Sequence, residues 1–171
     1  MPPVLTRMAG GLIVSCQARA DNPLYGPAFM AAIARAAEAG GAAGLRMNGP
    51  DDIRAACHIV SIPIIGLFKR RCAQYAVEIT PTFAEAAGAD AVATTLSGYL
   101  NPAVPPPDEP DLDLVSALAG RLGVPVIAEG RIRTPAQARA ALDRGAYAVV
   151  VGTAITNPRE ITRWYIREMT A

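Results

Sequence analysis

The 171-residue sequence contains few of the residues that would indicate a metal centre, a disulfide scaffold or a bound nicotinamide. It has one histidine, and its three cysteines, Cys16, Cys57 and Cys72, are odd in number and lack Cys-x-x-Cys spacing. We therefore expect reduced thiols and no metal site, since no His-x-His or His-Glu-x-x-His spacing occurs either. A Gly-x-Gly-x-x-Gly fingerprint is also missing, so no cofactor is expected.

An excess of charge of one sign is also lacking, because 16 basic and 15 acidic residues leave a net charge of +1. Without a run of lysines and arginines, the chain has no electrostatic footprint for nucleic acid or an anionic membrane surface. The apolar stretch from Met8 to Val14 is too short to span a bilayer and leads into no small-residue cleavage site. We expect a cytoplasmic protein whose partner is a small molecule.

Apolar residues, in contrast, make up 51% of the chain, which suffices for the core of one domain. Six runs that are apolar at nearly every position predict strands buried on both faces, at 11–17, 43–47, 62–69, 91–95, 124–129 and 146–152. Helical patterns fall at 29–39, 50–57, 112–122, 135–144 and 159–169. This alternation predicts an α/β domain with parallel strands and right-handed crossovers.

An internal repeat supports this fold class. The segments 36–42, 83–89 and 141–146 each lead a helix end through glycine and alanine into a strand. Glycine ends a helix there because it enters the left-handed conformation cheaply. The proline-rich segment 101–110 is interpreted as a loop from strand to helix, with Asp111 as the N-cap of the helix that follows. A linker between domains is the alternative.

Two of the predicted strands read almost alike, and each ends in a charge. The segment 61–69 runs Ser-Ile-Pro-Ile-Ile-Gly-Leu-Phe-Lys, and 123–129 runs Gly-Val-Pro-Val-Ile-Ala-Glu. In parallel-barrel folds the carboxyl ends of the strands face the active site. Lys69 and Glu129 are therefore predicted to form an acid/base pair over one pocket. A strand-end lysine that reaches solvent and a glutamate in a surface ion pair are the alternatives.

Six motifs occur in order: Gly-Leu-Ile-Val-Ser-Cys-Gln from residue 11, Ile-Pro-Ile-Ile-Gly-Leu-Phe-Lys-Arg from 62, Ile-Thr-Pro-Thr from 79, Thr-Thr-Leu-Ser-Gly-Tyr from 94, Val-Ile-Ala-Glu-Gly-Arg from 126 and Val-Gly-Thr-Ala-Ile-Thr from 151. Together they closely resemble the N-acetylmannosamine-6-phosphate 2-epimerase family. The resemblance implies a (β/α)8 TIM barrel. It also implies an isomerase that interconverts N-acetylmannosamine 6-phosphate and N-acetylglucosamine 6-phosphate in sialic acid catabolism.

The chemistry of such an epimerase suits the residues found. Inverting the carbon next to a carbonyl needs a base, an acid, and donors that hold the developing enolate oxygen. Lysine can serve as base or proton donor when burial and neighbouring cations lower its pKa. The resemblance implies that Lys69 and Glu129 transfer the proton at C2. It implies that Gln17 and Arg46 hold the sugar and its carbonyl side.

The phosphate is expected near the last two strands, where barrels form a phosphate site from loop amides and a short helix N-terminus. The candidates for this role are Gly130, Arg131, Gly152 and Thr153. Glycine lets amides approach the anion, and arginine can donate two parallel hydrogen bonds, whereas a plain tight turn is the alternative. The loop that starts at Ser97 and runs through Tyr99 is expected to close over the sugar, so both residues are candidates for substrate binding.

The sequence departs from the family at two places. A complete barrel has eight strands in at least about 200 residues, and here the family's fourth and fifth strands are missing, with an aspartate that helps to bind the sugar. We therefore predict a single incomplete barrel-like domain, 1–171, of about six βα units with a deletion junction near 80–92. A truncated gene model, a deletion and a compact variant all agree with this pattern. The second departure is Asn157, in place of a phosphate-site arginine that Arg159 could replace.

These features leave three functions open. The first is the epimerase, the second is a catalytically silent phosphosugar-binding remnant, and the third is another phosphate-binding barrel enzyme. Each predicts an amino-sugar phosphate or a similar small molecule as partner, and each is compatible with a homodimer. Cys16, beside the first strand end, is expected to fill a small apolar space rather than act as a nucleophile, because no histidine is motif-linked to it.

Overall fold

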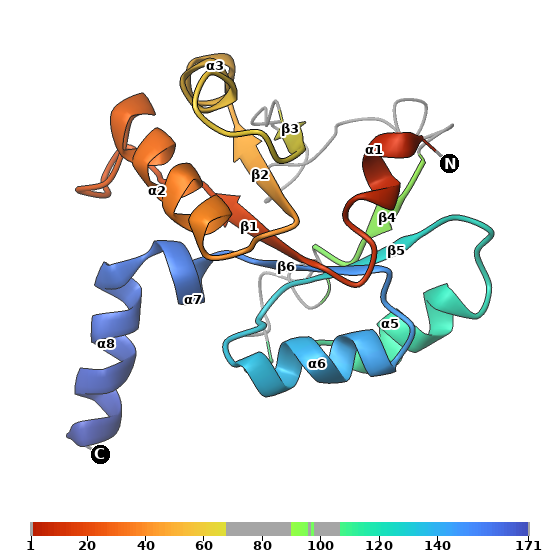
Figure 1. The fold of residues 1–171 in the computed structure, drawn as a ribbon. Coiled ribbons are helices and arrows are strands. Elements are labelled where there is room, and N and C mark those ends of the chain that lie inside the picture. The colour runs from red at the N-terminus through yellow and green to blue at the C-terminus, as the bar shows by residue number, and fades with distance from the viewer. Residues whose placement is uncertain (1, 68–89, 96, 98–106, 171) are drawn as a thin grey trace, which may run out of the picture.

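The computed structural model describes residues 2–67, 90–95, 97 and 107–170, so the candidates Lys69 and Tyr99 lie outside the described residues. Within these ranges, six parallel strands form one sheet (Figure 1). They are β1 (Leu12–Cys16), β2 (Gly44–Asn48), β3 (Ile64–Leu67), β4 (Val92–Ala93), β5 (Val126–Glu129) and β6 (Ala148–Val151). Each overlaps one of the intervals expected from the sequence, which confirms the predicted strands.

The strand order β3-β2-β1-β6-β5-β4 places the first and last strands next to each other. Val14 of β1 pairs with Leu45 of β2 on one side and with Val151 of β6 on the other. In a (β/α)8 barrel the first and last strands are neighbours because the sheet closes on itself. In the described part of the chain, β3 and β4 are the two edges of the sheet. The fold is thus an incomplete barrel of the predicted type.

Helices cover the outer face of this sheet. In chain order the described helices are α1 (Pro3–Thr6), α2 (Pro27–Ala39), α3 (Pro50–Cys57), α5 (Leu112–Ala119), α6 (Pro135–Asp143), α7 (Thr153–Thr156) and α8 (Pro158–Met169). In Figure 1, α2 and α3 flank β1 and β2, whereas α5 and α6 lie against β5 and β6. The sequence patterns missed α1 and α7, because four residues are too few to show a helical period.

Alternate residues of β1, β5 and β6 enter different apolar cores. Val14 and Leu45 pack outwards, in the cluster that α2 and α3 cover. Ile13, Ile127 and Val150 instead meet in a second cluster on the inner face of the curved sheet. Both faces of β1, β5 and β6 are therefore buried, which explains why these strands read as continuous apolar runs rather than as alternating ones. The edge strands β3 and β4 are less buried.

The short helix α1 closes the amino end of the sheet. Leu5 and Met8 join Ile13 and Val150 in the inner cluster. The hydroxyl of Tyr147 donates a hydrogen bond of 3.0 Å to the carbonyl oxygen of Leu5, which ties α1 to the residue before β6. The inner space is thus filled with apolar side chains at the amino ends of the strands, and polar side chains follow toward the carboxyl ends.

The helix-to-strand turns are built on glycine, as the repeat predicted. Gly41 and Gly145 have φ angles of 88° and 93°, in the region that favours glycine. The turn of the second repeat, 83–89, lies outside the described residues. The N-cap prediction is also confirmed, because Oδ1 of Asp111 accepts a hydrogen bond of 3.0 Å from the amide of Leu114 in the first turn of α5.

The last helix, α8, extends away from the sheet in Figure 1, and none of its residues is buried. Its side chains Tyr165, Ile166 and Met169 are 68%, 55% and 78% exposed. Apolar side chains gathered on one exposed element are typical of interaction surfaces, so they agree with a homodimer, which stays a prediction. Of the described helices, none is long and apolar enough to cross a membrane.

Candidate active site

Arg46 and Glu129 form an ion pair inside the curved sheet. Arg46 lies in β2 and Glu129 ends β5, and Nη1 of the arginine is 2.8 Å from Oε1 of the glutamate. Their side chains are only 11% and 13% exposed. The hydroxyl of Thr95 donates to the other carboxylate oxygen, Oε2, at 2.7 Å. Both oxygens of Glu129 are therefore held, and its carboxylate has one defined orientation.

Because Arg46 and Glu129 are nearly buried, the charge of each is compensated by the other. Desolvation lowers the pKa of Arg46, while the negative charge of Glu129 acts in the opposite direction. An arginine side chain nevertheless stays protonated at neutral pH. Removal of either partner would leave the other charged and desolvated, which is unfavourable. The site thus contains a fixed cation beside a fixed carboxylate, which is what stabilisation of an enolate and transfer of a proton require.

Thr94 sets the backbone position of Glu129. Its Oγ1 accepts a hydrogen bond of 2.9 Å from the amide of Glu129 and donates one of 2.8 Å to the carbonyl oxygen of the same residue. Thr94 and Thr95 directly follow β4, so the edge strand positions the glutamate through two neighbouring hydroxyls. Both threonines belong to the motif that begins at residue 94, but no role was predicted for them. The feature that could have indicated this role is the pair of threonines at the end of a predicted strand.

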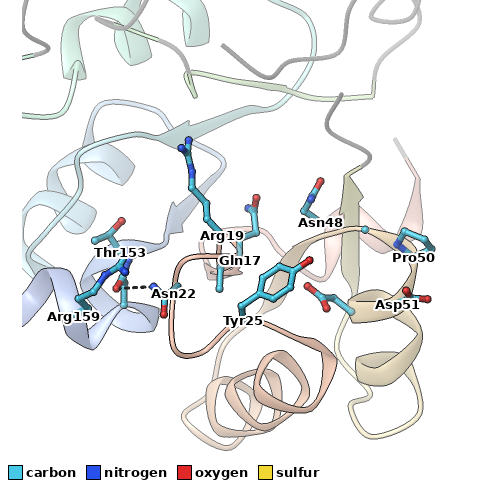
Figure 2. Close-up of a pocket in the computed structure, with 13 residues that line it drawn as sticks. Gln17, Arg19, Asn22, Tyr25, Asn48, Pro50, Asp51, Thr153 and Arg159 are labelled. Atoms are coloured by element: carbon cyan, nitrogen blue, oxygen red, sulfur yellow. Dashed lines mark hydrogen bonds between the residues drawn. The ribbon is translucent and has the colours of Figure 1, made fainter. Parts of the chain in front are cut away.

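A pocket of about 480 Å³ lies at the carboxyl ends of β1 and β2 and beside α7 (Figure 2). Its lining includes the polar side chains Gln17, Arg19, Asn22, Asn48, Thr153 and Arg159. The side chain of Gln17 is oriented by a hydrogen bond of 2.7 Å from its Nε2 to the hydroxyl of Ser15. The structure therefore brings two predicted candidates, Gln17 and Thr153, into one pocket.

The ends of β1 and β6 lie close together at Gly152. A Cβ atom at this position would be 3.4 Å from the Cβ of Ser15, an ordinary van der Waals contact. The Thr156 hydroxyl donates a hydrogen bond of 3.1 Å to the carbonyl oxygen of Ser15, which fastens α7 to β1. This close approach places Thr153, the first residue of α7, next to the loop that follows β1.

Gly130 and Arg131 form the turn after β5, with φ angles of 116° and 58°. The guanidinium of Arg131 donates to the carbonyl oxygens of Ser97 and Glu109. The Ser97 hydroxyl in turn donates to Asp111, and this bond, with a backbone hydrogen bond in α5, lowers the pKa of Asp111. These side chains thus join the two ends of the 97–111 segment to the site. Their roles in binding substrate or phosphate remain predictions.

Cys16 is fully buried among the apolar side chains beneath α2. Burial raises the pKa of its thiol to about 11, so the thiolate that a nucleophile requires is scarce at neutral pH. This agrees with the apolar role expected from the sequence. In the part of the chain that the structure describes, no cluster of three His, Cys, Asp or Glu side chains is placed to hold a metal ion.

A family model described as "Putative N-acetylmannosamine-6-phosphate epimerase" (NanE) matches residues 30–86 and 82–171. The chain belongs to the NanE family. A relative from Caldanaerobacter subterraneus that carries the corresponding 2-epimerase name is 41% identical, over 95% of this chain and 92% of that protein. A second one, from Cutibacterium acnes, is 38% identical and is matched over 95% of both chains.

A solved structure supports the same family. The N-acetylmannosamine-6-phosphate 2-epimerase from Clostridium perfringens superposes on this NanE-family chain with a TM-score of 0.89 and 32% identity, covering 98% of this chain and 97% of the other. The alignment with the Caldanaerobacter relative extends over 220 positions, whereas this chain has 171 residues. At least 49 aligned positions therefore hold no residue of this chain.

Proposed function

We propose that the protein interconverts N-acetylmannosamine 6-phosphate and N-acetylglucosamine 6-phosphate by exchanging the proton at C2. The observation that carries this proposal is the Arg46–Glu129 ion pair at the carboxyl ends of the strands, in a chain of the NanE family. The relatives and the solved homologue carry this activity in their names. A role in the catabolism of amino sugars such as sialic acid follows from the substrate pair and is part of the proposal.

The reaction requires the sugar to be open, because the proton at C2 becomes acidic when C1 is an aldehyde. A base breaks the C2–H bond, and the electron pair moves onto the carbonyl oxygen to give an enolate. An acid then delivers a proton to the opposite face of C2, and the carbonyl re-forms. Nothing is oxidised or reduced, so two proton-transfer groups and one cation near the oxygen suffice.

Glu129 is suited to one of the two proton transfers. Arg46 and Thr95 hold one carboxylate oxygen each, but every carboxylate oxygen has a second lone pair that can accept a proton. Arg46 supplies the fixed positive charge that an enolate oxygen needs. The second proton transfer is assigned to Lys69, on the resemblance of its motif, and Gln17 is assigned to the sugar hydroxyls.

We also propose that two βα units of the barrel are missing, with the junction near 80–92. Three observations support this: the two segments matched by the family model meet at 82–86, the alignment is longer than the chain, and β3 and β4 are the edges of the described sheet. A βα unit has about 30 residues, so two units agree with the length difference. The proposed epimerase therefore acts with a shortened wall on one side of the site.

The test measures exchange of the proton at C2. Purified protein is incubated with N-acetylmannosamine 6-phosphate in deuterium oxide and observed by proton NMR, with the Glu129→Gln variant as the control for contaminating activity. We expect N-acetylglucosamine 6-phosphate with deuterium at C2, formed about 100-fold or more slowly by the variant. Folded wild-type protein that forms neither the epimer nor deuterated substrate would contradict the proposal.

A silent phosphosugar-binding protein is the second candidate, favoured by the shortened chain alone. A ligand that binds only the folded state raises the melting temperature. Stabilisation by either sugar phosphate, with no exchange at C2 in deuterium oxide, would therefore support this candidate over the epimerase.

The assignment of Lys69 can be tested separately because the sequence contains a single lysine. Reductive methylation with 13C-formaldehyde would label Lys69 and the N-terminal amine, and the two signals can be told apart with a Lys69→Arg variant. A proton-transfer role predicts a pKa for Lys69 below the usual value of about 10.4. An unshifted titration would favour a solvent-exposed lysine.

A further inference from the structure

The pocket at the carboxyl ends of β1 and β2 is lined, in the described part of the chain, by two cations, Arg19 and Arg159. A phosphate monoester carries close to two negative charges at neutral pH, and charge-assisted hydrogen bonds from arginine recognise it well. The position of the phosphate group thus depends on which arginine is free to bind it.

Arg159 is already paired with acidic groups of the chain. Its Nη2 is 3.1 Å from Oδ2 of Asp21, and its Nη1 donates a hydrogen bond of 2.9 Å to the carbonyl oxygen of the same residue. Its Nε lies 3.4 Å from Oε1 of Glu160, without a hydrogen bond. A phosphate group that bound the two Nη atoms of Arg159 would have to displace both acceptors on Asp21.

Arg19, in contrast, is not paired with any of the described residues. Its guanidinium has neither a hydrogen-bond nor an ion-pair partner among the residues that the structure describes. It stands two residues after Gln17, in the loop that leaves β1, and β1 is the neighbour of β6. Figure 2 shows its side chain extending out of this loop, on the side of the pocket where Gln17 and Thr153 are drawn.

The other side of the pocket is acidic. Asp51 and Asp52, in the first turn of α3, belong to its lining. Asp51 is paired with Arg54 at 2.9 Å, while burial and the charge of Asp51 both disfavour the charged form of Asp52 and raise its pKa. A dianion is repelled by this side, so the charges of the pocket direct it toward Arg19.

We propose that Arg19 binds the phosphate group of the substrate, on the side of the pocket where Thr153 lies. The identity of the sugar rests on the proposed function above, whereas the phosphate contact rests on the charges of the pocket. The phosphate is expected from the sequence at Gly130, Arg131, Gly152 and Thr153. The proposal shares Thr153 with that set and adds a cation from the loop after β1.

The experiment compares the wild type with Arg19→Gln and with a matched control, Arg121→Gln. Arg121 is also exposed, but it lies in the turn that leads into β5, at the amino end of the strands. Each variant is titrated calorimetrically with N-acetylglucosamine 6-phosphate, with N-acetylglucosamine and with inorganic phosphate. Loss of a charge-assisted hydrogen bond predicts a phosphosugar affinity about 10- to 100-fold weaker for Arg19→Gln. The unphosphorylated sugar should be unaffected, and Arg121→Gln should match the wild type.

Three results would overturn the proposal: phosphosugar binding that Arg19→Gln leaves unchanged, equal weakening of the phosphorylated and unphosphorylated sugars, and wild-type protein that binds neither phosphosugar nor phosphate. Partial recovery of phosphosugar affinity in Arg19→Lys would support it, since lysine keeps the charge but not the bidentate geometry. If the wild type binds the phosphosugar through Arg19 but exchanges no proton at C2, the proposed function fails and the phosphate contact stands.

Discussion

Nη1 of Arg46 lies 2.8 Å from Oε1 of Glu129, although β2 and β5 are separated in the sheet by both β1 and β6. In a flat sheet, three strand spacings would put the two backbones roughly 14 Å apart. The side chains meet because the sheet curves and both point to its inner face. Curvature thus brings a cation from one half of the chain to a carboxylate from the other half.

The Glu129→Gln variant should lose both activity and stability. Removal of a proton-transfer group is expected to lower kcat by about 100-fold or more. The substitution also leaves Arg46 charged and nearly buried without its partner, at a cost of about 3 kcal/mol in the free energy of unfolding. Exchange at C2 in deuterium oxide and urea denaturation measure the two effects.

A double variant separates the ion pair from general damage. Arg46→Gln combined with Glu129→Gln removes both charges, so we expect it to be more stable than the sum of the two single losses predicts. Purely additive losses would mean that the two side chains do not stabilise each other.

Asp111→Ala should destabilise the protein in a pH-dependent way. Loss of the N-cap of α5 costs about 1 kcal/mol at pH 7. Because the pKa of Asp111 is lower in the folded than in the unfolded chain, its carboxylate stabilises the fold above the unfolded pKa of about 3.9. That contribution is lost as pH falls through the lower folded value. Urea denaturation should therefore show the gap between variant and wild type narrowing below about pH 4, and a gap equally large at pH 2.5 would contradict this.

Cys16 and Cys57 should differ strongly in reactivity. Cys57 is exposed, whereas Cys16 is buried with its pKa raised to about 11. Iodoacetamide at pH 8 should alkylate Cys57 within minutes and leave Cys16 unmodified until the chain unfolds, because the thiolate is the reactive species. Peptide mass spectrometry quantifies both sites. Equal labelling of the folded protein would show that Cys16 is accessible and ionised.

Gly145→Ala should destabilise the turn before β6, and Gly123→Ala provides the matched control. Gly145 has a φ of 93°, and a Cβ there would also come within 3.1 Å of the Ala119 side chain. We expect a loss of about 1–2 kcal/mol in the free energy of unfolding. Gly123 has no positive φ and open space around it, so its alanine variant should be neutral or slightly stabilised. A similar effect of both variants in urea denaturation would contradict the assignment of strain to Gly145.

Much of the fold was predictable because its signals are local. A strand buried on both faces is apolar at nearly every position. The turn at Gly145 and the helix start at Asp111 can be predicted from the residues next to them in the sequence. The strand-end position of Glu129 was equally visible. The role of Thr94 was not, because its two hydrogen bonds reach the backbone of a strand that follows much later in the chain.

The sequence by itself determined the order of the βα units, the apolar strands, the polar residues that end them and the family to which the chain belongs. Only the tertiary structure decided which charges are neighbours. Arg46 is paired with Glu129, Arg159 with Asp21 and Arg131 with loop carbonyls, while Arg19 has no partner among the described residues. Three of these arginines lie in a strand or in the loop after one, and Arg159 lies in α8. Their positions along the chain do not show which of them is paired. The pairing cannot be inferred from the sequence because the distance between side chains of non-adjacent strands depends on the curvature of the whole sheet. That curvature results from the packing of all the strands and helices together.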